Sequence, residues 1–281
     1  MSTKILVTGA TGDVGVHLLE ELVKKDSVVV YAAICAEDKE SKKLEIKGIE
    51  YVVVDYYNVK ETFGRVLEDV DTLFLDTSGS PNMPEYVKEI IDEAKQAGIK
   101  DIVYHDETTD SSQEIKDYII KSGIPYTIIQ SNGFMQDYAH LLKGSMKATG
   151  NIAIPVGKSK INPVDIRDTG SVLAEALTKV EYRNEAYTLT GNDPLSFDDL
   201  AQVFSGALGK KINYTDVTEE LYSDQASEAG LSSSLIKDNL DKFKRIRDGH
   251  LALLTGDVEK FLGREPNPFK VFAIEFAHNF K

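Results

Sequence analysis

Three glycines near the amino end have the type and spacing to bind a diphosphate. Gly9, Gly12 and Gly15 follow the apolar run Ile5–Val7, and apolar residues then recur at helical spacing as far as Val23. A buried strand, a glycine turn and a helix in this order direct main-chain N–H groups and a positive helix end at one point. Gly9 would permit the tight turn, Gly12 the close approach of a phosphate, and Gly15 the contact between helix and strand. We therefore expect a pyrophosphate site here; the alternative is a glycine turn that binds nothing.

Asp13 stands inside the same turn. A carboxylate there repels a phosphate group unless it points into solvent, where water screens its charge. A diphosphate site at this turn therefore requires an outward-facing Asp13.

The overall charge argues against a nucleic-acid partner. Asp and Glu total 46 against 32 Lys and Arg, so the chain of 281 residues has a net charge of −14 and repels a phosphate backbone at long range. The hydrophobic fraction of 42% suits a globular protein, and no run approaches the roughly 20 apolar residues of a membrane span. We expect a cytoplasmic protein that binds neither nucleic acid nor a membrane.

Strands and helices alternate through the first half of the chain. Short apolar runs at 27–34, 51–54, 72–75, 102–104 and 126–129 are separated by helical patterns. This alternation predicts an α/β fold, a Rossmann-type doubly wound parallel sheet whose ligand lies across the carboxyl ends of the strands.

The second half predicts a smaller, mainly helical C-terminal substrate-binding region. We expect a dinucleotide-binding Rossmann domain at 1–150 with its sheet completed by about 161–190, and a smaller domain at 191–281 with 144–160 contributing. Four phenylalanines near the end recur at helical steps and would form core or the face of a homodimer: Phe269, Phe272, Phe276 and Phe280.

Six stretches resemble the NmrA-like branch of the atypical short-chain dehydrogenase/reductases. They occur in the expected order and span nearly the whole chain: Thr8–Gly15, Ala97–Tyr104, Ser122–Met135, Val164–Asp168, Tyr187–Thr218 and Ile246–Phe269. That group includes NAD(P)H-dependent quinone and triphenylmethane-dye reductases, and also regulators that bind a dinucleotide without turning it over. The resemblance is specific for the fold and leaves the reaction open, because one fold hosts many functions.

The resemblance also implies roles for individual residues. The residues that would wrap the pyrophosphate are Gly9, Thr11, Gly12, Asp13, Val14 and Gly15. Asp55 would lie beside the adenine. The residues that would flank the cofactor where the fourth strand ends are Thr77, Ser78 and Gly79. The residues that would lie beside the nicotinamide and wall the substrate pocket are Asn132, Gly133, Phe134 and Met135, with core packing as the alternative for the last two.

The end of the second strand leaves the choice of cofactor open. Relatives that use NADPH carry an arginine there and a lysine four residues later, where this chain has Cys35 and Lys39. A guanidinium binds a 2′-phosphate with two parallel hydrogen bonds, whereas the Cys35 thiol cannot form such a pair of bonds. Lys39 could supply charge alone, and Glu37 or Asp38 could instead bind ribose hydroxyls, as suits NADH. We expect NADP(H) or NAD(H) as the cofactor, and NADP is favoured because relatives in this family commonly use it.

The usual catalytic pair of short-chain dehydrogenases is missing. That pair is a tyrosine four residues before a lysine, and Tyr118 with Lys121 is one residue short. Reversible alcohol oxidation is therefore not expected. Hydride transfer to a quinone or a dye does not require this pair, because such acceptors can take their proton from water.

His105 is the candidate proton donor for a reduced acceptor, and a plain polar loop residue is the alternative. No metal site is expected from His105, Asp106 and Glu107, because neighbouring residues on an extended chain point to opposite sides.

These features predict an NAD(P)H-dependent oxidoreductase of the NmrA-like type that transfers hydride to a quinone-like or other conjugated small molecule. The first alternative is a catalytically weak or inactive NAD(P)-binding redox sensor or regulatory protein. The second, a sugar-nucleotide epimerase or dehydratase, is disfavoured by the missing tyrosine–lysine pair.

Overall fold

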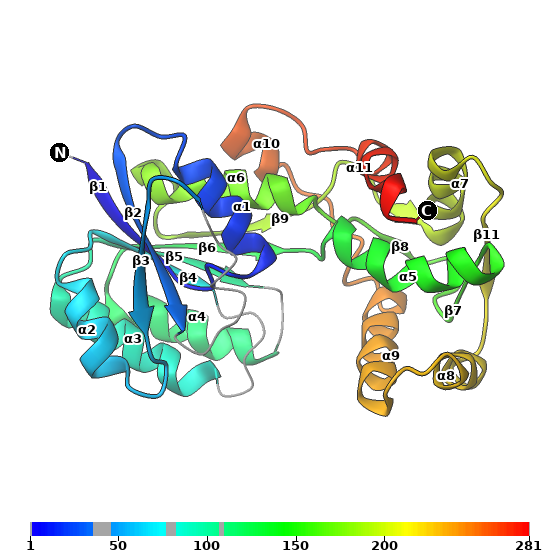
Figure 1. The fold of residues 1–281 in the computed structure, drawn as a ribbon, viewed down its shortest axis with the longest axis horizontal. Helices are drawn as coiled ribbons and strands as arrows, with labels where there is room; N and C mark the ends of the chain where they lie inside the picture. Colours follow the sequence, from blue (N-terminus) through cyan, green and yellow to red (C-terminus); the bar gives the residue numbers. More distant parts are fainter. Residues whose placement is uncertain (1, 36–45, 77–82, 107–109, 281) are drawn as a thin grey trace. The chain divides into compact units, whose positions relative to one another are not determined.

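The computed structural model describes residues 2–35, 46–76, 83–106 and 110–280. By their contacts these residues form two compact units, which are described separately (Figure 1). The first unit consists of Met1–Ser131, Ile166–Leu189 and Asp257–Arg264. The second consists of Asn132–Asp165, Thr190–Gly256 and Glu265–Lys281.

A parallel sheet forms the centre of the first unit. Its order in the described part of the chain is β3-β2-β1-β4-β5-β6-β9. The strands are β1 Thr3–Val7, β2 Val28–Cys35, β3 Ile49–Val54, β4 Thr72–Asp76, β5 Asp101–Asp106, β6 Tyr126–Ser131 and β9 Glu185–Leu189. The chain winds outward in one direction from β1 and in the other from β4, so the switch point where such sheets bind ligands lies between these two strands. This order confirms the predicted doubly wound α/β fold.

Helices cover both faces of this sheet, as Figure 1 shows: α2, α3 and α4 pack along one face, and α1, α6 and α10 along the other. The bounds are α1 Asp13–Leu22, α2 Val59–Leu67, α3 Met83–Ala97, α4 Asp110–Ser122, α6 Ile166–Thr178 and α10 Asp257–Leu262, with a 3₁₀ turn at Val180–Tyr182. Leu18, Leu19 and Leu22 of α1 are fully buried, as the helical spacing of the sequence predicts.

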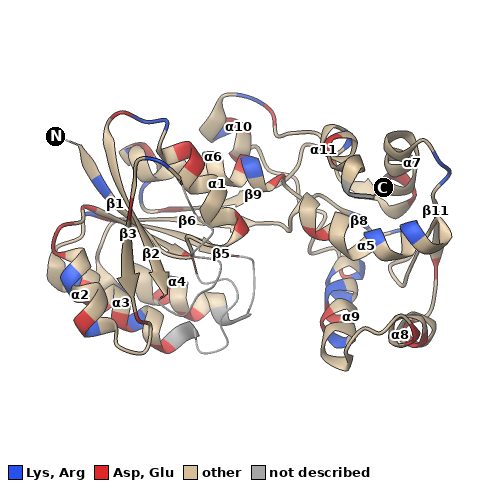
Figure 2. Cartoon of the chain, in the orientation of Figure 1, with Lys and Arg blue, Asp and Glu red and all other residues tan. Residues whose placement is uncertain are grey.

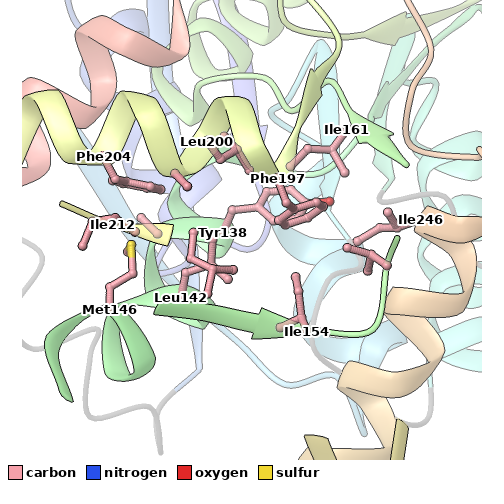
Figure 3. Close-up of a cluster of buried hydrophobic side chains, with 14 of the residues drawn as sticks. Tyr138, Leu142, Met146, Ile154, Ile161, Phe197, Leu200, Phe204, Ile212 and Ile246 are labelled. Atoms are coloured by element: carbon pink, nitrogen blue, oxygen red, sulfur yellow. The ribbon is translucent and has the colours of Figure 1, made fainter. Parts of the chain in front are cut away.

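The second unit is mainly helical, with two small two-stranded ladders. Strand β7 (Asn151–Ile154) pairs parallel with β11 (Asn213–Asp216), and β8 (Lys160–Ile161) pairs antiparallel with β10 (Leu195–Ser196). The helices are α5 Met135–Thr149, α7 Phe197–Leu208, α8 Glu219–Glu228, α9 Ser233–Arg247 and α11 Phe269–Phe276, followed by a 3₁₀ turn at Ala277–Phe280. Their buried side chains form the core shown in Figure 3.

The division by contacts differs from the predicted domain boundaries in three places, and the first of these is 161–165, expected to complete the sheet but assigned to the second unit. Helix α5, expected in the first domain, lies in the second unit because its apolar face, including Leu142 and Met146, packs with α7. Residues 257–264, expected in the C-terminal domain, lie in the first unit, where Phe261 stacks on Tyr182 with ring centroids 3.9 Å apart.

Two of the four late phenylalanines belong to the core of the second unit. Phe269 and Phe272 are buried, and the half-buried Phe276 packs against them. The side chain of Phe280 lies outside the described residues.

Basic residues gather on α9 although the chain as a whole is acidic (Figure 2). Arg247 forms an ion pair with Glu219 of α8, and Lys242 Nζ lies 3.9 Å from Asp137 Oδ2 of α5. These two contacts join α9 to its neighbours within the second unit. Among the described residues, none of the helices joins the length and the apolar composition needed to cross a bilayer.

Candidate functional site

Two positions of the amino-terminal turn have a steric need for glycine, Gly9 and Gly15. Gly9 adopts a left-handed conformation with φ of +61°, and the Gly12 N–H donates to its carbonyl oxygen at 3.0 Å. A Cβ on Gly15 would lie 2.1 Å from the Gly9 carbonyl oxygen, a distance at which atoms overlap. The start of α1 therefore lies in close contact with the turn, and at position 15 only glycine allows this approach.

The amino end of α1 has the features of an anion site. Gly12 is its N-cap residue and has no side chain that could cap the N–H groups of the first turn. Asp13 is exposed, whereas Val14 and Gly15 are buried and Thr11 is half-buried. Any contact of Val14 with a ligand would therefore come from its main chain. The exposed Asp13 faces solvent, as a diphosphate site at this turn requires.

Tyr56 is a residue of this site that the sequence reasoning missed. Burial raises its pKa, and the nearby Cys35, Tyr86 and Asp76 act in the same direction, while a hydrogen bond with the main chain of Gly9 acts against them. Its ring packs 5.2 Å from that of Tyr86. Tyr56 therefore connects the carboxyl end of β3 to the glycine turn. Its place directly after Asp55 at a strand end was the only hint in the sequence.

Asp55 begins the turn that leads from β3 into α2. Its Oδ1 accepts a hydrogen bond from the Tyr57 N–H at 2.8 Å, and the Thr62 hydroxyl donates to its carbonyl oxygen at 3.1 Å. These bonds hold the turn in one conformation, with the Asp55 carboxylate exposed and the ring of Tyr57 93% exposed.

A chain of buried polar groups crosses the carboxyl ends of β4, β5 and β6. His105 Nε2 lies 3.0 Å from the Ser131 hydroxyl, and its Nδ1 lies 3.8 Å from Asp76 Oδ1. The His105 side chain is 0% exposed and that of Asp76 is 4% exposed. The sequence predicts for His105 a proton donor or a polar loop residue. His105 lies inside the sheet instead, because β5 is buried along its whole length.

Asp106 points away from His105 and pairs with Lys116 of α4, with Oδ2 and Nζ 2.8 Å apart. Both side chains are largely buried, so each charge compensates the other's loss of solvation. The described residues contain no group of three or more His, Cys, Asp or Glu side chains that could hold a metal ion.

The segment expected to wall the substrate pocket lies in the second unit and is mostly buried. Phe134 is 3% exposed and forms an isolated bridge with Val164, and Met135 is 1% exposed within the apolar core. Asn132 is buried as well, whereas Gly133 is half-buried with φ of +80°. For Phe134 and Met135 the observed packing is that of the alternative stated for them, core residues.

Of the remaining residues discussed from the sequence, some lie outside the described part of the chain. Lys39, Thr77, Ser78 and Gly79 lie outside the described residues, as do Glu37, Asp38 and Glu107. Cys35 is half-buried at the end of β2, and the Tyr118 hydroxyl donates to Asp92 of α3 at 2.9 Å, on the outer surface of the helices.

Comparison with known proteins places the chain in a family. A model of the NmrA-like family matches residues 1–253. The chain is 27% identical over 286 residues to the NAD(P)H azoreductase of Xenophilus azovorans, an alignment that covers 98% of this chain and 99% of that protein. The triphenylmethane reductase of Citrobacter sp., solved with NADP(H), has the same fold, with a TM-score of 0.87 and 22% identity over 98% of this chain and 99% of that one.

The NADPH-dependent quinone oxidoreductase of Escherichia coli, solved with NADPH, is equally similar, with a TM-score of 0.88 and 22% identity over 99% of this chain and 100% of that one. The two solved structures, at this identity, support the fold. The match to the family model covers most of the sequence and reaches from the glycine turn of the first unit to the end of α9 in the second. The chain therefore belongs to the NmrA-like family.

Proposed function

We propose that this chain is an NAD(P)H-dependent oxidoreductase that transfers hydride to a quinone-like or other conjugated small molecule. The observation that carries the proposal is the glycine turn, in which Gly9 and Gly15 bring an uncapped helix end to the switch point of the sheet. The azoreductase relative, which aligns along the whole chain, supports a reductase with a conjugated acceptor.

The glycine turn fits a dinucleotide diphosphate. Main-chain groups of the turn would hold it, and the residues concerned are Gly9, Thr11, Gly12, Asp13, Val14 and Gly15. Tyr56 keeps this turn in position through its hydrogen bond with Gly9, and Asp55 would lie beside the adenine. When bound, the reduced nicotinamide supplies the hydride. We also propose that Thr77, Ser78 and Gly79 flank the cofactor, and that NADP is preferred through Lys39.

On the acceptor side we propose that the segment from Asn132 to Met135 forms the wall. Gly133 is its half-buried member and would face the acceptor, while Phe134 and Met135 support it from the core. A conjugated acceptor takes its proton from water, so the missing tyrosine–lysine pair is no obstacle. His105, with no exposed surface, suits a role in holding Asp76 and Ser131 better than direct proton donation.

Steady-state oxidation of NADPH and of NADH by the purified chain, with a panel of quinones and azo dyes, tests this function. We expect turnover with at least one conjugated acceptor, and a lower KM for NADPH than for NADH. Tight cofactor binding without turnover of any acceptor would contradict the proposal and favour the redox-sensor alternative.

We further propose a cytoplasmic homodimer. Val271 and Ile274 on the outer side of α11 are 43% and 56% exposed, an apolar pair that a second copy could cover. Light scattering of the purified protein measures the mass in solution, and a monomer at micromolar concentration would contradict the dimer.

A further inference from the structure

A carboxylate lies against the glycine turn that is proposed to bind the diphosphate. Asp76 ends β4, and a Cβ placed on Gly9 would be 2.9 Å from Asp76 Cβ and 3.4 Å from Asp76 Oδ2. The Asp76 side chain is 4% exposed, so water screens its charge only weakly. An ionised Asp76 would therefore repel an anion bound to the main chain of this turn, unless another group cancels its charge.

Hydrogen bonds of the first unit hold Asp76 in this place. The Thr8 hydroxyl accepts from the Asp76 N–H at 3.0 Å and donates to the Phe74 carbonyl oxygen at 3.0 Å. The Thr8 N–H donates to the same carbonyl oxygen at 3.1 Å, and Thr8 as a whole is 1% exposed. Moving Asp76 away from the turn would break these buried bonds, so its carboxylate stays beside the turn.

His105 is placed to cancel this charge. It is the register partner of Asp76 on the neighbouring strand β5, with Nδ1 3.8 Å from Asp76 Oδ1, and its Nε2 lies 3.0 Å from the Ser131 hydroxyl of β6. Two ionisable groups this close titrate as a unit. With one proton the pair is neutral overall, whichever of the two residues holds it, and without that proton the pair has one negative charge.

The charged residues on the elements that pack against His105 have partners of their own. The buried charged residue of α6, which packs on β5, is Asp168, and Arg264 donates to its Oδ1 at 2.7 Å. Asp106, next to His105 on β5, pairs with Lys116 at 2.8 Å. Among the described residues, Asp76 is therefore the carboxylate whose charge His105 is placed to offset.

Two further titratable groups lie near Asp76 at the carboxyl ends of β2 and β3. Tyr56 is uncharged at neutral pH, because burial raises its pKa and the nearby Cys35, Tyr86 and Asp76 act in the same direction. The Cys35 thiol is the second group. Its titration is a competing source of any pH dependence at this site, and a test has to separate it from that of His105.

We infer that His105 is a positioning residue of the dinucleotide site: it acts through Asp76, and the proton that the two residues share removes the charge that would otherwise repel the diphosphate. This inference rests on the proposed function and adds a pH dependence to it. As the pH rises, the pair loses its proton, the turn gains a buried negative neighbour, and dinucleotide affinity falls. As the pH falls, the pair regains the proton from solvent and affinity returns.

Isothermal titration of the whole chain with NADP⁺ between about pH 6 and pH 9 tests this inference. We expect the wild-type Kd to rise with pH by about fivefold to twentyfold, beyond any contribution of the ligand. His105→Gln should raise Kd by this factor at the low end of the range and leave it unchanged at the high end. The glutamine can still bond the Ser131 hydroxyl, but it holds no exchangeable charge.

Asp76→Asn tests the same pair from the other side. Because it removes the negative charge, it should lower Kd by the same factor at the high end of the pH range and have little effect at the low end. Adding His105→Gln to Asp76→Asn should then change Kd at the high end no further. The 2′-phosphate of NADP⁺ titrates alike in every variant, so ratios of variant to wild type isolate the protein groups.

His250→Gln is the matched control, because it removes an exposed imidazole of the second unit and should preserve the wild-type pH profile. A loss of affinity in His105→Gln that is equal at every pH would show a purely structural role and overturn the inference. So would a pH dependence that persists in His105→Gln and disappears in Cys35→Ser. If His105→Gln does not fold, Asp76→Asn decides alone, and an unchanged Kd at high pH would overturn the inference.

Failure of the proposed function gives a different result. A wild type that binds NADP⁺ with the expected pH profile but reduces no acceptor would contradict the reductase and support the inference. A wild type that binds NADP⁺ and reduces an acceptor, but keeps its pH profile in His105→Gln, would contradict the inference alone. A wild type that binds no dinucleotide would contradict both.

Discussion

At the scale of single residues, the glycine turn depends on contacts that leave no room for a side chain. A Cβ on Gly15 would overlap the Gly9 carbonyl, and a Cβ on Gly9 would lie 2.9 Å from Asp76 Cβ. Tyr56 adds a hydrogen bond from the other side of the turn. The proposed diphosphate site is therefore sensitive to changes of one or a few atoms.

Gly15→Ala should open the turn. We expect the free energy of unfolding to fall by about 1–3 kcal/mol, because the new methyl group overlaps the Gly9 carbonyl. Losing one main-chain hydrogen bond to a phosphate costs about 1.5–3 kcal/mol, so NADPH affinity should fall about tenfold or more in a fluorescence titration. Gly144→Ala is the control: this exposed glycine of α5 has nothing within 4 Å of a new Cβ, and the substitution should leave binding unchanged. Equal affinities of Gly15→Ala and the wild type would show that the turn does not bind the diphosphate.

Tyr56→Phe should loosen the turn without disturbing its packing. The ring contacts with Phe63 and Tyr86 persist, while the hydrogen bond with Gly9 is lost at a cost of about 0.5–1.5 kcal/mol. The dissociation constant for NADPH should rise severalfold, measured by isothermal titration calorimetry. Tyr31→Phe, at a half-buried tyrosine whose hydroxyl donates to Asp69 at 3.3 Å, should leave this dissociation constant unaltered. An identical effect of both substitutions would argue against a specific role for Tyr56.

At the scale of elements, α1 contributes a positive amino end and an acidic residue to the same place. Asp13 is favourable for the helix, because a negative charge stabilises the first turn, but unfavourable for an anionic ligand. Its exposure lets solvent weaken the second effect. Helix stability and anion affinity are thus in opposition at this position.

Asp13→Asn should separate the two effects. We expect affinity for NADPH to rise about two- to fivefold at low salt and less at high salt, while stability to urea falls by about 0.3–1 kcal/mol. Asp26→Asn makes the same charge change just before the amino end of β2, whereas the glycine turn follows the carboxyl end of β1, and it should not alter the affinity. A salt-independent gain, or none, would mean that Asp13 lies too far from the bound phosphates to act on them.

At the scale of the whole molecule, buried tyrosines make both units sensitive to alkaline pH. Burial raises the pKa of Tyr56 in the first unit and of Tyr138 and Tyr214 in the second. In the unfolded chain these groups ionise near 10.0, the ordinary value for tyrosine. Above that pH the unfolded state loses protons that the folded state keeps, so the folded state loses stability as the pH rises.

Urea unfolding between about pH 8 and pH 11 checks this expectation. Stability should be constant up to about pH 10 and then decline, each tyrosine contributing at most about 1.4 kcal/mol per pH unit. In Tyr138→Phe the decline should be shallower by one such contribution. A decline that begins well below pH 10, or an unchanged slope in this variant, would show that other groups are responsible.

Local patterns along the chain were sufficient to predict the elements of the sheet and the glycine turn. The order of apolar runs and helical stripes predicts the alternating strands and helices of a doubly wound sheet, and Gly9, Gly12 and Gly15 predict the turn that the structure contains. These features depend on neighbours within about 20 residues along the chain, so periodicity and turn chemistry suffice to predict them.

Contacts between residues that are distant in sequence could not be predicted in this way. His105 is buried against Asp76 and Ser131, Tyr56 reaches Gly9, and Tyr138 lies under Gly133 beside Lys242, more than 100 residues away in sequence. Burial and hydrogen-bond partners follow from how whole elements pack, and no local spacing encodes that packing. The same reason explains why the burial of Phe134 and Met135 could not be predicted from their positions in the sequence.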